Sequence, residues 1–341
     1  MAMHLNIYLF MILMNFSLAF ATRNLTNLSN EACVGDVSIG LSFGGYQEIC
    51  PEAEAIVYSW VDKAVADDPR MAASLLRLHF HDCIVNGCDA SVLLDDTPNF
   101  VGEKTAAPNA NSLRGFELID AIKSDIESLC PGVVSCADIL TIAARDSVIL
   151  SGGPGWQVET GRKDSRTASK TAANNDIPAP TSDVQTLVSK FQAAGLDLND
   201  VVTLSGAHTM GKARCTTFIS RLNGSADISS GIGPDVNLDF ISSLQQLCLA
   251  ADANAALAQL DLVTPSTFDN QYYVNLISGE GLLTSDQVLV TGDEQTRELV
   301  RLYAEDQEIF FEEFRRSMIR MGRLQPAGTD GEIRKNCRAV N

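Results

Sequence analysis

Histidine is scarce in this chain of 341 residues, which contains only four. His4 lies in the first 21 residues, which we expect to be removed, so His79, His81 and His208 are the histidines left for chemistry. These three, beside cysteines that we expect to form disulfides, offer no close set of ligands for zinc. A zinc hydrolase is therefore a poor interpretation.

Positive charge is also in deficit. The chain has 25 Lys and Arg against 43 Asp and Glu, which gives a net charge of −18. Such acidity disfavours nucleic acid, anionic lipid and polyanionic wall polymers as tight partners. Neutral or cationic small molecules and bound cations remain possible partners.

Long apolar runs are absent except at the start of the chain. Residues 7–20 are almost wholly apolar, and Ala19-Phe20-Ala21 gives the small-x-small pattern of a signal-peptidase site. A membrane anchor is the alternative, but the run is short, and no other stretch approaches the roughly 20 apolar residues of a span. We therefore expect residues 1–21 to be a signal peptide and the protein to be secreted and extracellular, away from the membrane.

Nine cysteines in a secreted chain predict disulfides with one cysteine left over. Residues 22–40 are polar and are predicted to be a mobile arm. Cys33 lies in this arm and is the candidate for the unpaired cysteine. Three glycosylation motifs, at Asn24, Asn27 and Asn223, fit the same compartment.

Long alternating patterns typical of β-strands are missing, as are tandem repeats and long linkers, so we predict an all-α fold in one domain, residues 41–341. A short hairpin is possible within residues 156–182. Apolar residues recur at helical spacing elsewhere. The predicted helices are 51–65, 70–81, 116–129, 136–150, 184–194, 200–209, 238–248, 270–277, 294–303 and 307–321.

The segment 70–81 carries an unusual polar stripe. Each helical residue advances by about 100°, so Arg77 and His81 share a face with Phe80 beside them, while His79 points nearly the opposite way. Acids and cysteines follow at once. A solvated Arg–His pair is the plainer interpretation, but the apolar neighbours of this pair favour a functional site.

The chemistry of this pair suits peroxide cleavage. Breaking the O–O bond requires a proton to move from one oxygen to the other, which a neutral imidazole such as His81 can do. The permanent charge of Arg77 can stabilise the leaving oxygen. His208 follows two small residues, Gly206 and Ala207, which would leave room for a flat macrocycle, and imidazole is the usual proximal ligand of peroxide-reacting heme iron.

Several stretches resemble the class III plant secretory heme peroxidases: residues 74–95, 132–144, 203–215, 261–269 and 284–286. The run Arg-x-x-Phe-His-Asp-Cys-x-Val-x-Gly-Cys-Asp-Ala-Ser at 77–91 is highly specific, and Ser-Gly-Ala-His-Thr occurs with it at 205–209. The similarity extends from about Cys50 to the C-terminus. It implies a heme peroxidase fold of about ten main helices, with heme between distal and proximal halves and a minor β-hairpin.

The resemblance also implies roles for individual residues. His81 would be the distal acid–base, Arg77 the transition-state stabiliser and Asn109 the residue that orients His81. His208 would be the axial ligand of heme b, and Asp286 would accept the N–H of its imidazole. Pro178 would lie at the edge where donors approach.

Two calcium sites are implied in the same way. The distal set is Asp82, Val85, Gly87, Asp89 and Ser91; the proximal set is Thr209, Asp261, Thr264, Thr267 and Asp269. Without the resemblance, a solvated acidic loop would be favoured, because the spacing is not that of an EF-hand. The implied disulfides are Cys50–Cys130, Cys83–Cys88, Cys136–Cys337 and Cys215–Cys248. The residues alone allow many pairings, and favour only the short Cys83–Cys88 loop.

The expected function is a secreted heme peroxidase that reduces hydrogen peroxide and oxidises small phenols in successive one-electron steps. Its roles would lie in cell-wall phenolic or lignin metabolism and in the response to oxidative stress. We expect a monomer with heme b and two calcium ions, and no nucleic-acid partner. The alternative is a non-catalytic, disulfide-rich calcium-binding protein on the same scaffold, which would take up no heme.

Overall fold

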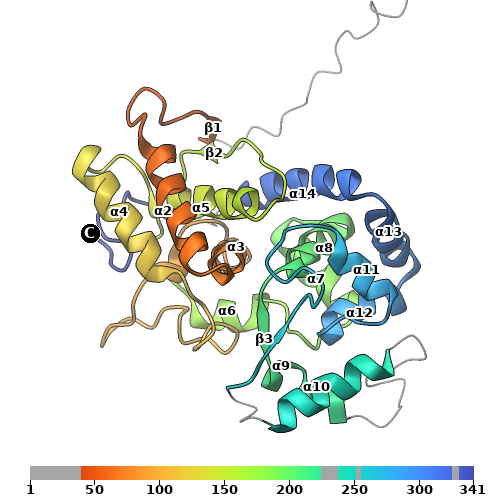
Figure 1. Ribbon diagram of the computed structural model, residues 1–341. Helices are drawn as coiled ribbons and strands as arrows, with labels where there is room; N and C mark the ends of the chain where they lie inside the picture. The colour runs from red at the N-terminus through yellow and green to blue at the C-terminus, as the bar shows by residue number, and fades with distance from the viewer. Residues whose placement is uncertain (1–39, 224–236, 251–254, 325–329) are drawn as a thin grey trace, which may run out of the picture. The chain divides into compact units, whose positions relative to one another are not determined.

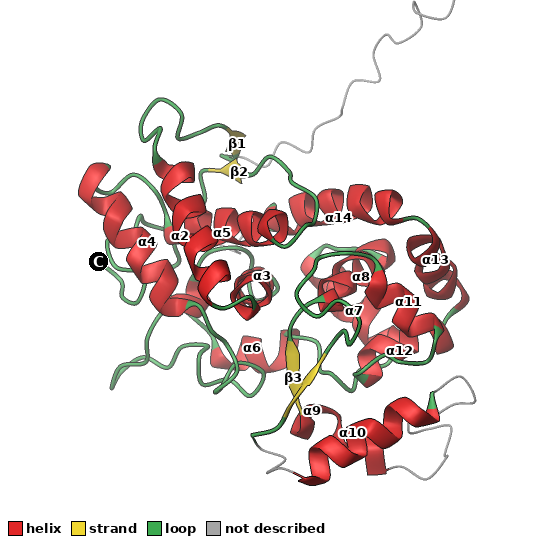
Figure 2. Cartoon of the chain, viewed as in Figure 1, coloured by secondary structure: helices red, strands yellow, loops and turns green. Residues whose placement is uncertain are grey.

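The computed structural model describes residues 40–223, 237–250, 255–324 and 330–341, and these residues are mostly helical (Figures 1 and 2). The predicted all-α class is therefore confirmed. The signal peptide at 1–21, most of the arm at 22–40, and Cys33, Asn24 and Asn27 lie outside the described residues. None of the described helices combines the length and the apolar character needed to cross a membrane.

One group of helices is built on a central buried helix. The group contains α2 (Ala53–Asp67), α3 (Arg70–Cys83), α4 (Phe116–Leu129), α5 (Cys136–Leu150) and the 3₁₀ turn η1 (Ser91–Leu93). Helix α5 is buried on nearly every side, and both α2 and α3 pack against it. Ser135 caps α5 by accepting a hydrogen bond of 3.1 Å from the N–H of Asp138. The Asp138 carboxylate forms a buried ion pair with Arg162 at 2.8 Å.

A second group contains α7 (Val184–Ala194), α8 (Leu198–Ser205), the 3₁₀ turn η2 (Gly206–Thr209), α11 (Gln271–Ile277), α12 (Thr284–Thr291) and α13 (Glu294–Glu305). The long α14 (Gln307–Gly322) packs against both α8 and α3, and Figure 1 shows it running between α5 and α13. Two further helices, α9 (Cys215–Asn223) and α10 (Leu238–Ala250), form a small core of their own that includes Phe218, Phe240 and Leu244.

The β structure is minor but is not the hairpin expected within residues 156–182. Strand β2 (Glu159–Thr160) pairs antiparallel with the distant β1 (Ser42–Phe43), and residues 170–176 form helix α6 (Lys170–Asp176). Ser169 caps α6 by accepting from the N–H of Ala172. A second sheet joins β3 (Lys212–Arg214) to β4 (Leu257–Gln259).

The helix expected at 200–209 is divided at Gly206, where α8 gives way to η2. A Cβ atom at Gly206 would lie 2.4 Å from the Tyr273 hydroxyl and 2.7 Å from the Phe310 ring. This glycine therefore leaves space for core side chains, and not for the macrocycle that its sequence position suggested.

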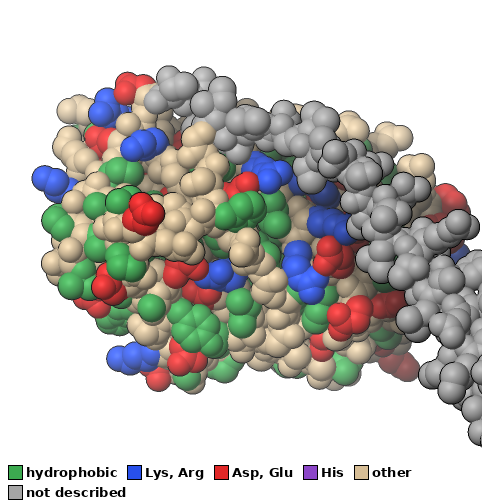
Figure 3. Space-filling model, turned by 90° about the horizontal axis from the view of Figure 1, so that it is seen from above, with side chains coloured by type: hydrophobic (Ala, Val, Ile, Leu, Met, Phe, Trp, Pro, Cys, Tyr) green, Lys and Arg blue, Asp and Glu red, His purple; other side chains and the backbone are tan. Residues whose placement is uncertain are grey.

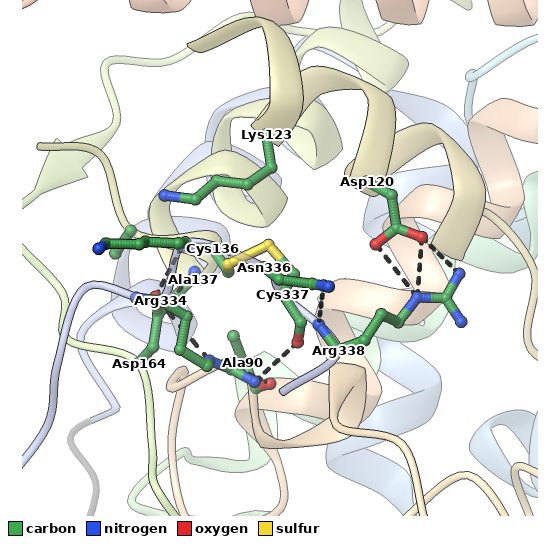
Figure 4. Close-up of a disulfide and its surroundings, with 12 residues drawn as sticks. Ala90, Asp120, Lys123, Cys136, Ala137, Asp164, Arg334, Asn336, Cys337 and Arg338 are labelled. Atoms are coloured by element: carbon green, nitrogen blue, oxygen red, sulfur yellow. Dashed lines mark hydrogen bonds and ion pairs between the residues drawn. A yellow bond between two sulfur atoms is a disulfide. The ribbon is translucent and has the colours of Figure 1, made fainter. Parts of the chain in front are cut away.

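All four disulfides implied by the resemblance are formed: Cys50–Cys130, Cys83–Cys88, Cys136–Cys337 and Cys215–Cys248. Figure 4 shows that Cys136–Cys337 fastens the C-terminal segment to the start of α5. Beside it the buried Arg334 donates hydrogen bonds to the carbonyls of Ala90 and Cys337, at 2.6 and 2.8 Å. The C-terminal segment thus braces the loop that follows α3.

Acidic and basic side chains are interspersed on the molecular face of Figure 3. Several arginines of the described residues are paired with acids one helical turn away, as in Arg297 with Glu294 and Arg316 with Glu313. The large negative charge is therefore not offset by a broad basic area on this face.

Candidate active site

The polar stripe of Arg77 and His81 lies in the C-terminal half of α3. His81 is buried, and its ring meets Phe80 edge-on with centroids 6.0 Å apart. Phe80 in turn packs against Phe191 of α7. The His81 side chain is only 5% exposed, which limits the access of water to the imidazole.

A single hydrogen bond orients His81. Its Nδ1 lies 2.6 Å from Oδ1 of the buried Asn109, whose own Nδ2 donates to the Glu103 carbonyl at 3.0 Å. Because the Asn109 oxygen is an acceptor, Nδ1 carries the proton and Nε2 presents a lone pair. Burial, and then the charge of Arg77, lower the pKa of His81 well below 6.5. The ring is thus a neutral base at neutral pH.

Arg77 is fixed by the loop that carries Asn109. Its Nη2 donates to the Pro108 carbonyl at 2.9 Å and to the Ser112 hydroxyl at 3.2 Å. Among the described residues its Nη1 and Nε make no hydrogen bond. Burial and the nearby Arg214 lower its pKa to about 10, so the guanidinium still carries its charge at neutral pH.

His79 stays outside this arrangement, as its helical position predicted. It is fully buried, and Nδ1 and Nε2 lie 3.5 and 3.8 Å from the Cys83 sulfur. Burial, followed by the charge of Arg162, lowers its pKa to about 3. His79 is therefore a neutral core residue.

We expect His79→Leu to change how stability depends on pH. In the wild type the unfolded chain takes up a proton near pH 6.5, whereas folded His79 does so only near pH 3. Folded stability is therefore lost as pH falls through this window, by about 1.4 kcal/mol per pH unit from this group. Denaturant titrations between about pH 6 and 4 should show a shallower decline for the variant. Parallel stability curves for the two proteins would contradict this prediction.

The second histidine pairs with a carboxylate. Nδ1 of His208, in η2, lies 2.7 Å from Oδ1 of the buried Asp286, in α12. The Tyr272 hydroxyl donates to the same oxygen at 3.2 Å, and the N–H of Leu283 donates to Oδ2 at 2.9 Å. The Nε2 atom of His208 makes no hydrogen bond to any described residue. A metal-binding histidine typically has this arrangement, with the second nitrogen tied to a carboxylate.

This donor set fits heme iron. His208 offers one free imidazole nitrogen, and His81 offers a buried imidazole that is not tied to a carboxylate. Two groups of possible ligands in the described part of the chain have close donor atoms, His79/Cys83/Cys88 and Cys50/Glu52/Cys130. Each contains both sulfurs of a disulfide, so neither suits zinc.

Pro178, the predicted residue of the donor edge, is half-buried in the loop between α6 and α7. Two residues later, the Pro180 carbonyl accepts a hydrogen bond of 3.0 Å from the N–H of Ser285, in the first turn of α12. The loop is therefore tied to the element that carries Asp286.

The acids after α3 form a buried cluster. Asp82 Oδ2 accepts from the N–H of Ala90 at 3.0 Å, but Asp82 Oδ1, Ser91 Oγ and Glu103 Oε2 are buried with no hydrogen-bond partner in the described part of the chain. Burial raises the pKa of Asp89 to about 6 and that of Glu103 to about 7. Burial, and then the charge of Asp89, raise the pKa of Asp82 well above 3.8.

The loop that closes around these acids bends through left-handed backbone positions at Asn86, Gly87 and Ala90, with φ of 65°, 99° and 58°. The carbonyls of Val85 and Gly87 accept no hydrogen bond from the described residues. These carbonyls and the unpartnered carboxylate and hydroxyl oxygens are all oxygen donors, the kind of ligand that calcium prefers.

Four of the five proximal candidates converge. The hydroxyls of Thr209 and Thr264 both donate to Asp269 Oδ1, at 3.0 and 3.2 Å, and both lie within 3.4 Å of Asp261 Oδ2. The side chain of Thr267 is exposed and makes no described hydrogen bond to this set. Two carboxylates that share the same pair of hydroxyls are also suited to a hard cation.

Sequence reasoning missed several residues around the two histidines. Glu103 supplies an unpartnered oxygen to the distal cluster, and Tyr272 and Leu283 hold Asp286. Two further cations are fully buried: Arg221, which is influenced by the charge of Asp286, and Arg334, which is influenced by the acids of the distal cluster. Only Glu103 had a local signal, because it lies six residues before Asn109 in the same loop.

Comparison with known proteins agrees with this geometry. The family model described as Peroxidase matches residues 57–306. The chain is 61% identical over 330 residues to Peroxidase 40 of Arabidopsis thaliana, covering 94% of each chain. It is 52% identical over 314 residues to Peroxidase 49 of the same plant, covering 91% of this chain and 94% of the relative. Peroxidase 4 of Vitis vinifera is 53% identical over 310 residues, covering 90% and 94% respectively.

Proposed function

The chain belongs to the class III plant peroxidases and is a heme peroxidase, and from this premise we propose that it is a secreted enzyme that oxidises phenolic donors. His81, Arg77 and Asn109 would act on the peroxide, and His208 with Asp286 would hold the iron. Nothing supports the non-catalytic alternative, since the relatives described above are peroxidases.

One observation carries this assignment: the two imidazoles have different partners. His81 donates to a neutral amide oxygen, whereas His208 donates to a carboxylate. The amide fixes the tautomer of His81 without adding negative charge. The carboxylate makes His208 more anionic, which stabilises oxidised iron. The first arrangement suits a proton-transfer base and the second suits an iron ligand.

The distal residues would act in sequence on hydrogen peroxide. Nε2 of His81 would accept a proton from one oxygen of hydrogen peroxide and return it to the other oxygen, which would leave as water. The free Nη1 and Nε of Arg77 stabilise negative charge on that oxygen while the O–O bond breaks. Bound heme supplies the iron at which peroxide is reduced and which then takes single electrons from donors.

We propose two calcium ions at the oxygen clusters. The distal ion would bind Asp82, Val85, Gly87, Asp89 and Ser91, and the proximal ion would bind Thr209, Asp261, Thr264, Thr267 and Asp269. Unpartnered oxygens support the distal site, and shared hydroxyls support the proximal site. A divalent ion would compensate the buried acids and fix the chain beside each histidine.

The remaining proposals concern the setting of the enzyme. Residues 1–21 would direct secretion to the apoplast, residues 22–40 would form an arm, and residues 41–341 would act as a monomeric domain. Pro178 would contact donors. Phenols suit one-electron oxidation because the phenoxyl radical is delocalised, and neutral or cationic phenols suit an acidic protein.

A donor panel tests this function on purified, heme-loaded protein. We expect peroxide-dependent oxidation of simple phenols, with two phenol molecules consumed for each peroxide because each gives one electron. Matched methyl ethers, which lack the phenolic hydroxyl, should react far more slowly. A heme-loaded protein that consumes peroxide but oxidises none of the phenols would overturn the proposed donor class.

A further inference from the structure

Arg221 is a buried cation that the reaction scheme above does not use. It lies on α9 and is only 1% exposed. Its Nη1 donates to the Leu283 carbonyl at 3.0 Å, while Nε and Nη2 are buried and have no hydrogen-bond partner among the described residues. Unpaired donors on a buried charged group are costly, so a compensating interaction is to be expected here.

The compensating interaction is electrostatic and comes from Asp286. Leu283, whose carbonyl holds Arg221, also donates its N–H to Asp286 Oδ2 at 2.9 Å. One residue thus links the guanidinium to the carboxylate that holds His208. Burial lowers the pKa of Arg221, and the charge of Asp286 opposes that change. The cation and the carboxylate therefore interact through buried protein.

We propose that Arg221 is a positioning residue for the peroxidase reaction. Its buried positive charge limits how anionic the His208 imidazole becomes through its hydrogen bond to Asp286. This inference rests on the proposed role of His208 as the iron ligand. Arg221 would thereby set the reduction potential of the iron without touching heme or substrate.

The direction of the effect follows from charge. A carboxylate with no cation nearby attracts the Nδ1 proton of His208 more strongly, so the imidazole becomes more anionic and stabilises oxidised iron. Arg221 attracts the same negative charge from the other side and weakens this pull. Its positive field also disfavours the oxidised iron directly. Both effects make the potential more positive in the presence of Arg221.

Two substitutions remove the charge and one retains it. Arg221→Gln keeps a polar group, whereas Arg221→Met removes the charge together with the unpaired donors, and so should fold even where the glutamine variant does not. Arg221→Lys retains the cation. Lys123→Met is the matched control, because Lys123 is an equally buried cation in the other helix group, bound to Glu127 and the Val134 carbonyl.

The measurement is the ferric–ferrous midpoint potential of the heme-loaded proteins, by spectroelectrochemical titration. We expect a shift to more negative potential in Arg221→Gln and Arg221→Met, a much smaller shift in Arg221→Lys, and none in Lys123→Met. Resonance Raman spectra of the ferrous proteins should show a higher iron–imidazole stretching frequency in the charge-free variants. An unchanged potential in either charge-free variant would reduce Arg221 to a structural link between α9 and α12.

A separate arm tests the ligand itself. The iron–imidazole band should disappear in His208→Gly and return when imidazole is added. If the band persists without imidazole, the assignment of His208 has failed, which is distinguishable from failure of the role of Arg221.

Discussion

His81→Ala should slow the reaction of the heme-loaded enzyme with hydrogen peroxide by about 10²–10⁴-fold, the usual contribution of a positioned acid–base group. The variant removes the one imidazole whose Nε2 is free on the distal side, while Asn109 and Arg77 remain. Stopped-flow measurement of the second-order rate constant gives the result directly. Heme content should not change, because His208 is untouched.

The matched control for this experiment lies two residues away. His79→Leu also removes a buried imidazole from α3, but from the opposite face, where its ring nitrogens have only the Cys83 sulfur as a polar contact among the described residues. Its rate constant should stay within a small factor of wild type. Wild-type reactivity in His81→Ala, or an equal loss in both variants, would contradict the assignment of the distal base.

The pH profile gives a second check on His81. Burial and the charge of Arg77 lower its pKa well below 6.5, and only the neutral ring can accept a proton. The wild-type rate constant should therefore be level at neutral pH and fall only in acid. In Arg77→Leu the pKa of His81 should rise, because a repelling charge is lost, so the fall should begin at higher pH.

Local patterns in the sequence were enough to single out Arg77 and His81, whereas Asn109 and the distal calcium ligands were identified only by the family resemblance. The stripe of Arg77 and His81 follows from helical periodicity alone, and the predicted helices 136–150 and 184–194 are bounded in the structure by the local caps Ser135 and Gly195. Such features depend on neighbours within one or two turns. They can therefore be predicted before any tertiary contact is known.

The proximal half depends on contacts between distant residues. Asp286 lies 78 residues after His208, and nothing local distinguishes it from other acids, so only the family resemblance identified it. Gly206 is required by Tyr273 and Phe310, which no spacing rule connects to it. Helices α6, α9 and α12 have seven, nine and eight residues, too short for a clear period.

Arg221 and the β1–β2 pairing were missed for the same physical reason. The charge of Arg221 acts through Leu283, 62 residues away in the chain, and would be taken for a solvated cation from sequence alone. Strands of two residues carry no alternating pattern. Burial of charge and pairing of short strands are properties of the assembled fold.

The effect of Ser91→Ala on folding stability should have opposite signs in the presence and in the absence of calcium. Ser91 is 1% exposed, and its hydroxyl makes no hydrogen bond of ordinary geometry, although its proximity lowers the pKa of Asp89 and of Glu103. A buried unpaired hydroxyl is unfavourable, so losing it should leave the calcium-free protein equally stable or slightly more stable. With calcium bound, the same change removes a ligand and should destabilise the protein by about 1–3 kcal/mol.

Thermal unfolding of wild type and Ser91→Ala, with calcium and with a chelator, measures this reversal. Wild type should lose up to about 4 kcal/mol of stability on chelation if the ion is present at a thousand times its dissociation constant. Ser124→Ala is a control for surface hydroxyls, because that side chain is exposed and belongs to neither oxygen cluster. An identical effect of Ser91→Ala in both conditions would argue against an ion at this cluster.

Loss of calcium should also slow the peroxide reaction, because the distal oxygen cluster begins at Asp82, one residue after the proposed base His81. Asp82 follows His81 at the end of α3, and Asp82 Oδ2 holds the N–H of Ala90, while Arg334 holds the Ala90 carbonyl. Without the ion, three buried carboxyls face one another with Arg334 as a buried counter-charge, so we expect the loop to loosen and His81 to lose its fixed orientation. Chelation should therefore slow the peroxide reaction, and added calcium should restore it. If the calcium-free enzyme keeps its full rate of reaction with peroxide, the predicted dependence of His81 orientation on the ion is wrong.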